Sequence, residues 1–271
     1  SRHGSLGIAE SGRVYTGYER NYVSGTYKYY LKAYQSITSM VEPIWEIQLD
    51  NFYSPPVISK IDETIYLGGT PLRAIDKNGN IKWTFTADTC SNNFQILALN
   101  KDGILYANGC SNLYAINPDG SLKWQKSGIK GGSVSGNGNS VIDDQDTIFV
   151  LSSTDSQLRA LSQTDGSVLW TKNGVNNDVN LSYYQNVIYL AGFNYVEAIN
   201  SDNGNQIWRY NSLYYNLNLK HKLITKNNLI LLYFSDQPLQ AINLIDGTKE
   251  WEYDPQLINK NGSNVSINNV S

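Results

Sequence analysis

Three aspartates within four residues form a candidate metal site. Asp143, Asp144 and Asp146 lie in the stretch VIDDQDTIF. Clustered carboxylates suit Ca²⁺, but an EF-hand loop also needs regular acidic spacing, a glycine and a terminal glutamate, which this stretch lacks. We therefore interpret it as the acidic turn of a β-hairpin, and we expect neither a metal ion nor another cofactor.

Two histidines and a glycine-rich stretch are the other candidates for chemistry. His3 lies near the start of the chain and His221 lies in LKHKLIT. A Ser-His-Asp triad or a zinc site would need further groups in a recognisable arrangement, and neither a nucleophile elbow nor a Cys/His cluster is evident. The stretch SGIKGGSVSGNGNS, residues 127–140, lacks the GxxxxGK[ST] pattern of a phosphate loop. We recognise no catalytic set and interpret this stretch as a connection.

Charge and composition exclude several kinds of partner. The 271 residues carry 21 basic and 24 acidic side chains, a net charge of −3, which provides no basic footprint for nucleic acid or an anionic membrane. No apolar run approaches the roughly 18 residues of a membrane span. The first residues lack both a signal-peptide layout and a methionine, so we expect a processed or excised chain. Sparse charge and 20 tyrosines favour strands over long helices.

A repeat of about 40 residues organises the chain. Its tryptophans are separated by 38, 41, 46, 38 and 43 residues. An alanine precedes each tryptophan by 9 to 12 residues, and in the last five copies a glycine precedes it by four. The positions are Trp45, Trp83, Trp124, Trp170, Trp208 and Trp251; Ala33, Ala74, Ala115, Ala160, Ala198 and Ala241; and Gly79, Gly120, Gly166, Gly204 and Gly247.

Each repeat predicts four short strands. A compact apolar run such as TIYLGG (64–69) precedes each alanine, and a weaker extended segment such as FQILAL (94–99) precedes that run. Four strands in a period near 40 are typical of a β-propeller blade. We therefore predict an all-β propeller over residues 1–253, with six four-stranded antiparallel blades, and an Asn-rich tail or extra strand at 254–271. The alternative is a fragment of a seven- or eight-bladed ring.

The spacing also predicts how the tryptophan packs. In the second and third repeats it suits a hairpin with a four-residue loop, KNGN or PDGS, and places Ala115 opposite Trp124. Gly120 tolerates the positive φ that closes such a loop. Because an indole buries about 150–250 Å² of surface, we predict that each tryptophan packs at the junction between blades.

This phrase resembles the repeat of the pyrroloquinoline-quinone-type propellers, Ala-x-Asp-x-x-Thr-Gly-x-x-x-Trp, over residues 5–253. The matching residues include Ala74, Asp76, Gly79 and Trp83, and also Ala160, Thr164, Gly166 and Trp170. The resemblance implies a propeller, but the family contains two groups. One holds quinone-dependent alcohol and sugar dehydrogenases; the other holds non-enzymatic propellers, including the scaffold lipoprotein of bacterial outer-membrane assembly.

A quinone-dependent dehydrogenase is the enzymatic alternative. The resemblance implies that such an enzyme needs an acidic base, a set of Asn, Glu and Asp ligands for calcium, and usually a disulfide between neighbouring cysteines. Cys90 and Cys110 are 20 residues apart, and all six tryptophans belong to the repeat. We therefore favour the non-enzymatic group.

The two cysteines are expected at one end of the third blade, Cys90 before its first strand and Cys110 at the end of its second. They can form a disulfide if their Cα atoms come within about 7 Å. The alternative is two buried free thiols. A bond would indicate an oxidising compartment.

Tyrosines gather in two predicted loops. The stretch TGYERNYVSGTYKYY (16–30) reads as an insertion between the second and third strands of blade 1, and RYNSLYYNLN (209–218) connects blades 5 and 6. Strand topology assigns both to one face, and tyrosine suits binding surfaces. The alternative is that these rings only pack their own loops. The predicted patch is Tyr18, Tyr22, Tyr27, Tyr214 and Tyr215.

Together these features predict a non-enzymatic, extracytoplasmic, monomeric propeller. It would bind a protein or glycan through its loop face, as a scaffold or adhesion module, and would bind no nucleic acid. The alternatives are the quinone-dependent dehydrogenase, which calcium-dependent cofactor uptake would reveal, and a glycan-binding module, which retention on polysaccharide would reveal. Because fold does not give function, the prediction rests on the residues above.

Overall fold

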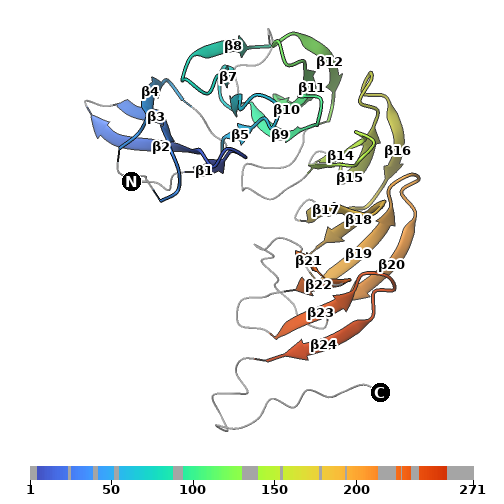
Figure 1. The fold of residues 1–271 in the computed structure, drawn as a ribbon. Helices are drawn as coiled ribbons and strands as arrows, with labels where there is room; N and C mark the ends of the chain where they lie inside the picture. The colour runs from blue at the N-terminus through green and yellow to red at the C-terminus, as the bar shows by residue number, and fades with distance from the viewer. Residues whose placement is uncertain are drawn as a thin grey trace, which may run out of the picture. The chain divides into compact units, whose positions relative to one another are not determined.

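Strands form six four-stranded antiparallel sheets in the described part of the chain, each built from consecutive strands (Figure 1). The computed structural model describes residues 5–23, 26–38, 42–51, 55–87, 94–129, 140–152, 155–176, 179–192, 194–212, 224–226, 228–232 and 238–254. The chain divides into two compact units. The first is Ser1–Gly136, Ser152–Thr154 and Ser162–Ser167; the second is Asn137–Leu151, Asp155–Leu161 and Val168–Ser271.

The first unit contains three sheets. The first sheet consists of β1 (Ser5–Ile8), β2 (Val14–Val23), β3 (Thr26–Tyr34) and β4 (Trp45–Leu49). The second consists of β5 (Val57–Ile58), β6 (Ile65–Leu67), β7 (Leu72–Ile75) and β8 (Ile81–Phe85). The third consists of β9 (Gln95–Leu99), β10 (Leu105–Gly109), β11 (Asn112–Ile116) and β12 (Leu122–Ser127).

The second unit contains most of the fourth sheet and all of the fifth and sixth. The fourth sheet consists of β13 (Ser140–Ile142), β14 (Ile148–Ser152), β15 (Gln157–Leu161) and β16 (Val168–Lys172). The fifth consists of β17 (Asn180–Tyr184), β18 (Val187–Ala191), β19 (Tyr195–Asn200) and β20 (Gln206–Asn211). The sixth consists of β21 (Ile224–Lys226), β22 (Leu229–Leu232), β23 (Leu239–Asn243) and β24 (Lys249–Tyr253).

Burial differs between inner and outer strands of a sheet. All five residues of β10 and of β14 are buried, which is why their sequences are mostly apolar. The fourth strand is different: in β12 only Trp124 is buried and its neighbours are exposed. The outermost strand therefore alternates, as expected when one face is packed and the other is solvated.

The hydrophobic core lies between consecutive sheets of each unit. In the first unit, Tyr15 and Leu31 of the first sheet cluster with Ile65 of the second. In the second unit, Trp208 of the fifth sheet clusters with Ile230 of the sixth. Sheet-on-sheet packing of this kind is the architecture that the repeat predicts for propeller blades.

In the third sheet, the predicted Ala–Trp pair is present, but the loop between β11 and β12 is one residue longer than predicted. Ala115 lies opposite Trp124, as the spacing predicts, but Ile116 pairs with Leu122. One residue of β12 is therefore bulged, and the loop runs over five residues, 117–121, instead of four. Two backbone bonds explain the difference: Asn117 N–H donates to the Ser121 carbonyl at 2.9 Å, and Gly120 N–H donates to the Asn117 carbonyl at 2.9 Å.

The tyrosine-rich stretch 16–30 is not an inserted loop, which corrects the sequence analysis. It belongs to β2 and β3, which have 10 and 9 residues, and the pairing continues through Arg20 opposite Lys28 and Val23 opposite Thr26. The reason is that main-chain bonds between two long strands satisfy the polar groups that a loop would leave to solvent.

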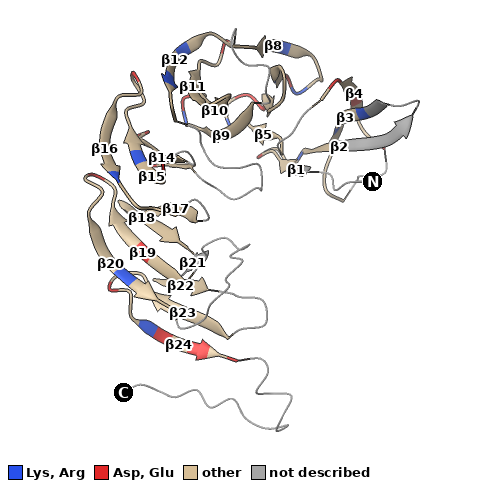
Figure 2. Ribbon diagram, turned by 180° about the vertical axis from the view of Figure 1, so that it is seen from behind, with Lys and Arg blue, Asp and Glu red and all other residues tan. Residues whose placement is uncertain are grey.

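Charged side chains are interspersed along the described strands, without a long run of one sign (Figure 2). This agrees with the near-neutral composition of the chain. Among the helices and strands that the structure describes, no helix is long and apolar enough to cross a membrane.

Candidate functional site

Five tryptophans each contact the C-terminal hairpin turn of the following repeat, an arrangement that we call the indole–turn contact. The indole N–H donates to a backbone carbonyl in that turn. The acceptors are Lys77 for Trp45 at 2.9 Å, Pro118 for Trp83 at 2.8 Å, Gln163 for Trp124 at 2.8 Å, Ser201 for Trp170 at 2.8 Å and Leu244 for Trp208 at 3.1 Å.

The turn glycine makes room for each ring. A Cβ placed on Gly120 would lie 2.7 Å from Cγ of Trp83, and one on Gly247 would lie 2.5 Å from Cε3 of Trp208. Gly120 also has a φ of 89°, a conformation that residues with side chains rarely adopt. The other three pairs, Gly79 with Trp45, Gly166 with Trp124 and Gly204 with Trp170, have the same arrangement.

Trp251 differs from the other tryptophans of the repeat. The side chains of Trp124 and Trp208 are 8% exposed, whereas that of Trp251 is 39% exposed. Its alanine partner is nevertheless in place, because Ala241 lies opposite Trp251 and is fully buried. Within the described residues, Trp251 makes no indole–turn contact. Five tryptophans thus make the indole–turn contact, and the packing of Trp251 at a blade junction stays a prediction.

The aspartate cluster forms the turn between β13 and β14, as the sequence analysis expects. The carboxylate of Asp143 accepts hydrogen bonds from the backbone N–H of Gln145 at 2.9 Å and of Thr147 at 2.8 Å. This carboxylate therefore serves the turn itself. In the described ranges, no group of three or more His, Cys, Asp or Glu side chains is placed to hold a metal ion. His3 and His221 lie outside those ranges.

Cys110 lies in the turn between β10 and β11, one residue beyond the strand end at which the sequence analysis places it. It has a φ of 58° and is disulfide-bonded. The chain has one other cysteine, Cys90, which lies outside the described residues. A Cys90–Cys110 bond therefore stays a prediction, and chemical labelling tests it below.

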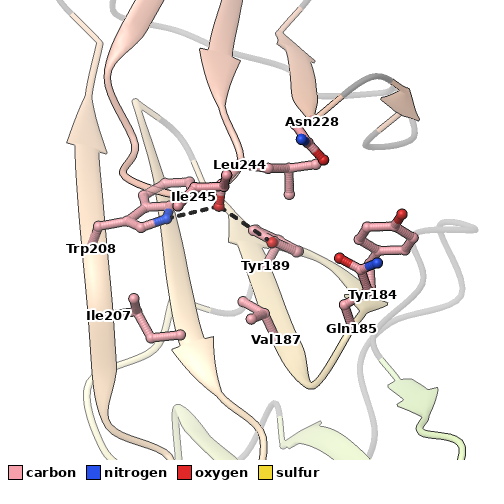
Figure 3. Close-up of a pocket in the computed structure, with 9 residues that line it drawn as sticks. All are labelled: Tyr184, Gln185, Val187, Tyr189, Ile207, Trp208, Asn228, Leu244 and Ile245. Atoms are coloured by element: carbon pink, nitrogen blue, oxygen red, sulfur yellow. Dashed lines mark hydrogen bonds between the residues drawn. The ribbon is translucent and has the colours of Figure 1, made fainter.

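A hollow of about 220 Å³ lies between the fifth and sixth sheets, beside the indole–turn contact of Trp208 (Figure 3). Tyr189 and Trp208 both donate to the carbonyl of Leu244, at 3.5 and 3.1 Å. Burial raises the pKa of Tyr189 to about 12, so its hydroxyl remains a donor near neutral pH. Ligand pockets usually enclose about 300–1,000 Å³, so this hollow is a gap at the blade junction and a poor ligand site.

The outer part of the β2–β3 hairpin is the structure's best candidate for contact with a partner. Among the described residues, β1 pairs with β2 as far as Gly17, and β4 pairs with β3 from Tyr29 onward. The segment 18–28 is thus a two-stranded ribbon whose outer edges have no neighbouring strand in the described sheet. Exposed strand edges offer main-chain N–H and C=O groups to a further strand. We call this segment the β2–β3 ribbon.

The predicted tyrosine patch is only partly placed. The backbones of Tyr18, Tyr22 and Tyr27 belong to the β2–β3 ribbon. Tyr214 and Tyr215 lie outside the described residues. The ribbon itself is what sequence reasoning missed. The signal was present, since Ser24-Gly25 is a turn dipeptide flanked on both sides by strand-forming tyrosine, threonine and valine.

Comparison with known proteins identifies relatives of this architecture. The family model of outer membrane protein assembly factor BamB matches residues 72–218 and 154–269. No curated protein sequence matches the chain. BamB from Moraxella catarrhalis has a similar solved structure, with a TM-score of 0.68 and 16% identity over 93% of this chain and 75% of that one.

Two further solved structures share the fold at low identity. The computationally designed Ika8 protein has a TM-score of 0.65 and 12% identity, over 92% of this chain and 73% of that one. A chain of the mitotic checkpoint complex has a TM-score of 0.63 and 11% identity, over 92% of this chain and 76% of that one. Unrelated proteins thus share this architecture, so these likenesses support the propeller fold alone.

Proposed function

The chain belongs to the family of outer membrane protein assembly factor BamB, and we propose that it is a non-enzymatic, extracytoplasmic scaffold that binds a protein partner through the β2–β3 ribbon. The observation that carries the proposal is the ribbon itself, two paired strands that extend beyond the described parts of both neighbouring strands of their sheet. An element that adds nothing to its own sheet is available for contact with another chain.

A protein is a better occupant of this surface than a glycan because the ribbon offers main-chain groups. Backbone N–H and C=O groups at a strand edge pair with an extended peptide at a spacing that another strand matches. The ribbon sequence contains three tyrosines, a residue type that gives binding surfaces contact area at a low cost in side-chain entropy.

The indole–turn contacts of five tryptophans support the non-enzymatic proposal. Five indoles are engaged at both the ring and the N–H by the turn of the following repeat. These rings stabilise the junctions between blades. A quinone-dependent enzyme would instead need a ring free to stack on its cofactor.

Site-specific photo-cross-linking tests the proposal. A photoreactive phenylalanine derivative replaces Tyr22 in the ribbon or, as the matched control, Tyr184, a 40% exposed tyrosine at the end of β17. In cells that express the full-length gene, we expect a protein adduct from position 22 in the extracytoplasmic fraction and little from position 184. Equal adducts at both positions, or an exclusively cytoplasmic protein, would contradict the proposal.

Two simple assays address the alternatives. When pyrroloquinoline quinone and Ca²⁺ are added to the purified protein, the absorbance spectrum of the mixture should equal the sum of the separate spectra of protein and cofactor. Polysaccharides in a native gel should leave its mobility unchanged. Saturable cofactor uptake would favour the dehydrogenase, and retardation that is lost on replacing Tyr22 with serine would favour the glycan-binding module.

A further inference from the structure

One buried position of the repeat changes its chemistry from sheet to sheet. The dipeptide Ala-Ile is preceded by arginine in β7, tyrosine in β11, glutamate in β19 and glutamine in β23. These four residues, which we call the pre-alanine residues, are at most 4% exposed; they are Arg73, Tyr114, Glu197 and Gln240. Because a buried polar group must find a partner, their variety implies that each has a different neighbour.

The pre-alanine residue of a sheet lies toward the preceding sheet. Side chains two residues apart in a strand share a face, so Glu197 shares a face with Ile199, which clusters with Ala160 of the preceding sheet. In the first unit, Tyr114 itself clusters with Ala74 of the preceding sheet. Each strand therefore uses its alanine toward the following sheet and its pre-alanine residue toward the preceding one.

Three pre-alanine residues contact the same place on the preceding sheet, the residue that follows its tryptophan by two. The contacts are Tyr114 with Phe85, whose rings meet edge-on with centroids 5.7 Å apart; Glu197 with Lys172, with 2.8 Å between Oε1 and Nζ; and Gln240 with Tyr210, whose hydroxyl donates to Oε1 at 3.3 Å. The middle contact is an ion pair without hydrogen-bond alignment. Three different chemistries thus occupy equivalent positions.

Arg73 reaches the preceding sheet through the two residues that follow β4. Its Nη1 donates to the carbonyl of Asn51 at 2.9 Å, and its Nη2 lies 3.6 Å from the carboxylate of Asp50. The junction between the first and second sheets therefore also has a pair of its own.

The indole–turn contact does not distinguish one neighbour from another. It uses a tryptophan, a glycine and a main-chain carbonyl in all five cases, so an outer strand of one repeat would fit the turn of several others. Repeat proteins are prone to misassembly of this kind. A buried position that faces the neighbouring sheet and differs between repeats supplies the missing information.

We propose that the pre-alanine residues specify which sheet packs against which. Specificity requires that a wrong neighbour costs free energy. With glutamate at position 114, an unpaired carboxylate would lie against the rings of Phe85 and Phe94. With tyrosine at position 197, the ammonium of Lys172 would lose its anion.

An exchange of residues between two junctions tests the proposal. The crossed chain combines Tyr114→Glu with Glu197→Tyr, so each junction holds the pre-alanine residue that suits the other. The matched chain adds Phe85→Lys and Lys172→Phe, which recreates the ion pair at one junction and the ring pair at the other. Both chains keep the amino-acid composition of the parent. Urea unfolding followed by tryptophan fluorescence gives the equilibrium constant for folding of each.

We expect an equilibrium constant for folding at least about tenfold larger in the matched chain than in the crossed chain, although the matched chain carries more substitutions. A matched chain that is no more stable than the crossed chain would overturn the proposal. Residues that only fill space gain nothing from the second exchange.

If neither exchanged chain folds, a smaller cycle at one junction decides. Lys172→Phe and Glu197→Tyr are compared with their combination, while Arg209, whose Nη1 lies 3.6 Å from Oε2 of Glu197, stays unchanged. The combined loss in the equilibrium constant should be at least about fivefold smaller than the product of the single losses. Additive losses, or a combination that does not fold, would contradict the proposal. Lys123→Phe, at an exposed lysine of β12, is the control for removing a charge from an outer strand.

Discussion

At the scale of single residues, the turn glycines combine two requirements, a positive φ and the absence of a Cβ. Gly120 needs both, because its φ is 89° and a Cβ would lie 2.7 Å from the ring of Trp83. Gly128 needs only the first, because its φ is 78° and no atom of the described residues lies within 4 Å of its Cβ position. Comparing substitutions at the two glycines therefore distinguishes the cost of backbone strain from the cost of steric overlap.

Replacing Gly120 with alanine should destabilise the protein more than replacing Gly128. The left-handed conformation costs roughly 1–2 kcal/mol in both variants, and overlap with the indole adds about 1–3 kcal/mol in the first. Urea unfolding followed by tryptophan fluorescence measures both free energies of unfolding. Equal losses of unfolding free energy in the two variants would show that the Trp83 ring does not restrict the side chain at position 120.

Trp124 is the residue whose side chain should matter most for stability in its strand. It is 8% exposed, its N–H donates to Gln163, and Gly166 faces its ring. Trp124→Ala should lower the free energy of unfolding by about 3–5 kcal/mol, as measured by urea denaturation. The control is Leu122→Ala in the same strand, which is 47% exposed and should cost less than about 1 kcal/mol. Similar effects of the two changes would reject the structural role of the indole.

At the scale of elements, the β2–β3 ribbon is separable from its sheet. Its pairs from Tyr18 to Lys28 lie beyond the last residues of β2 and β3 that β1 and β4 cover. Glu19 lies opposite Tyr29, so a two-residue Asn-Gly connection between them completes a shorter hairpin with a favourable turn. The described pairs of β1 with β2 and of β4 with β3 are all kept in such a chain.

The shortened hairpin should leave the fold intact and remove partner contact. We expect a midpoint of thermal unfolding within a few degrees of the parent, because no described strand other than β2 and β3 pairs with the shortened region. Circular dichroism checks the midpoint, and cross-linking from a position retained beside the turn, Tyr30, checks the partner. A large loss of stability would show that the ribbon contributes to the core. Undiminished cross-linking would show that the ribbon is not part of the proposed interface.

At the scale of the whole molecule, the disulfide is the feature that bears on compartment. Cys110 is disulfide-bonded, and the chain offers Cys90 as its partner. A bond that closes a loop of this length contributes about 3 kcal/mol by restricting the unfolded chain. The purified, denatured chain should therefore take up no alkylating reagent before reduction and two equivalents after it, by intact mass. Two labels without reduction would show that both thiols are free and would weaken the proposal of an extracytoplasmic location.

The repeat and the pairs within each hairpin were predictable because their causes are local. Ala115 and Trp124 are nine residues apart, and turn chemistry between them sets their register. The same reasoning places Asp143 in a hairpin turn and assigns the buried middle strands from their apolar runs. Composition and period were therefore sufficient for an all-β chain of four-stranded blades.

Tertiary structure alone decided what each indole contacts. The donor and acceptor of an indole–turn contact are 31 to 39 residues apart, so their meeting depends on how two finished sheets pack. The same holds for the exposure of Trp251, whose sequence context equals that of its buried counterparts, and for the length of β2 and β3. Local sequence specifies the strands and turns of each blade, whereas the burial of the blade's outer surface depends on the neighbour that packs against it.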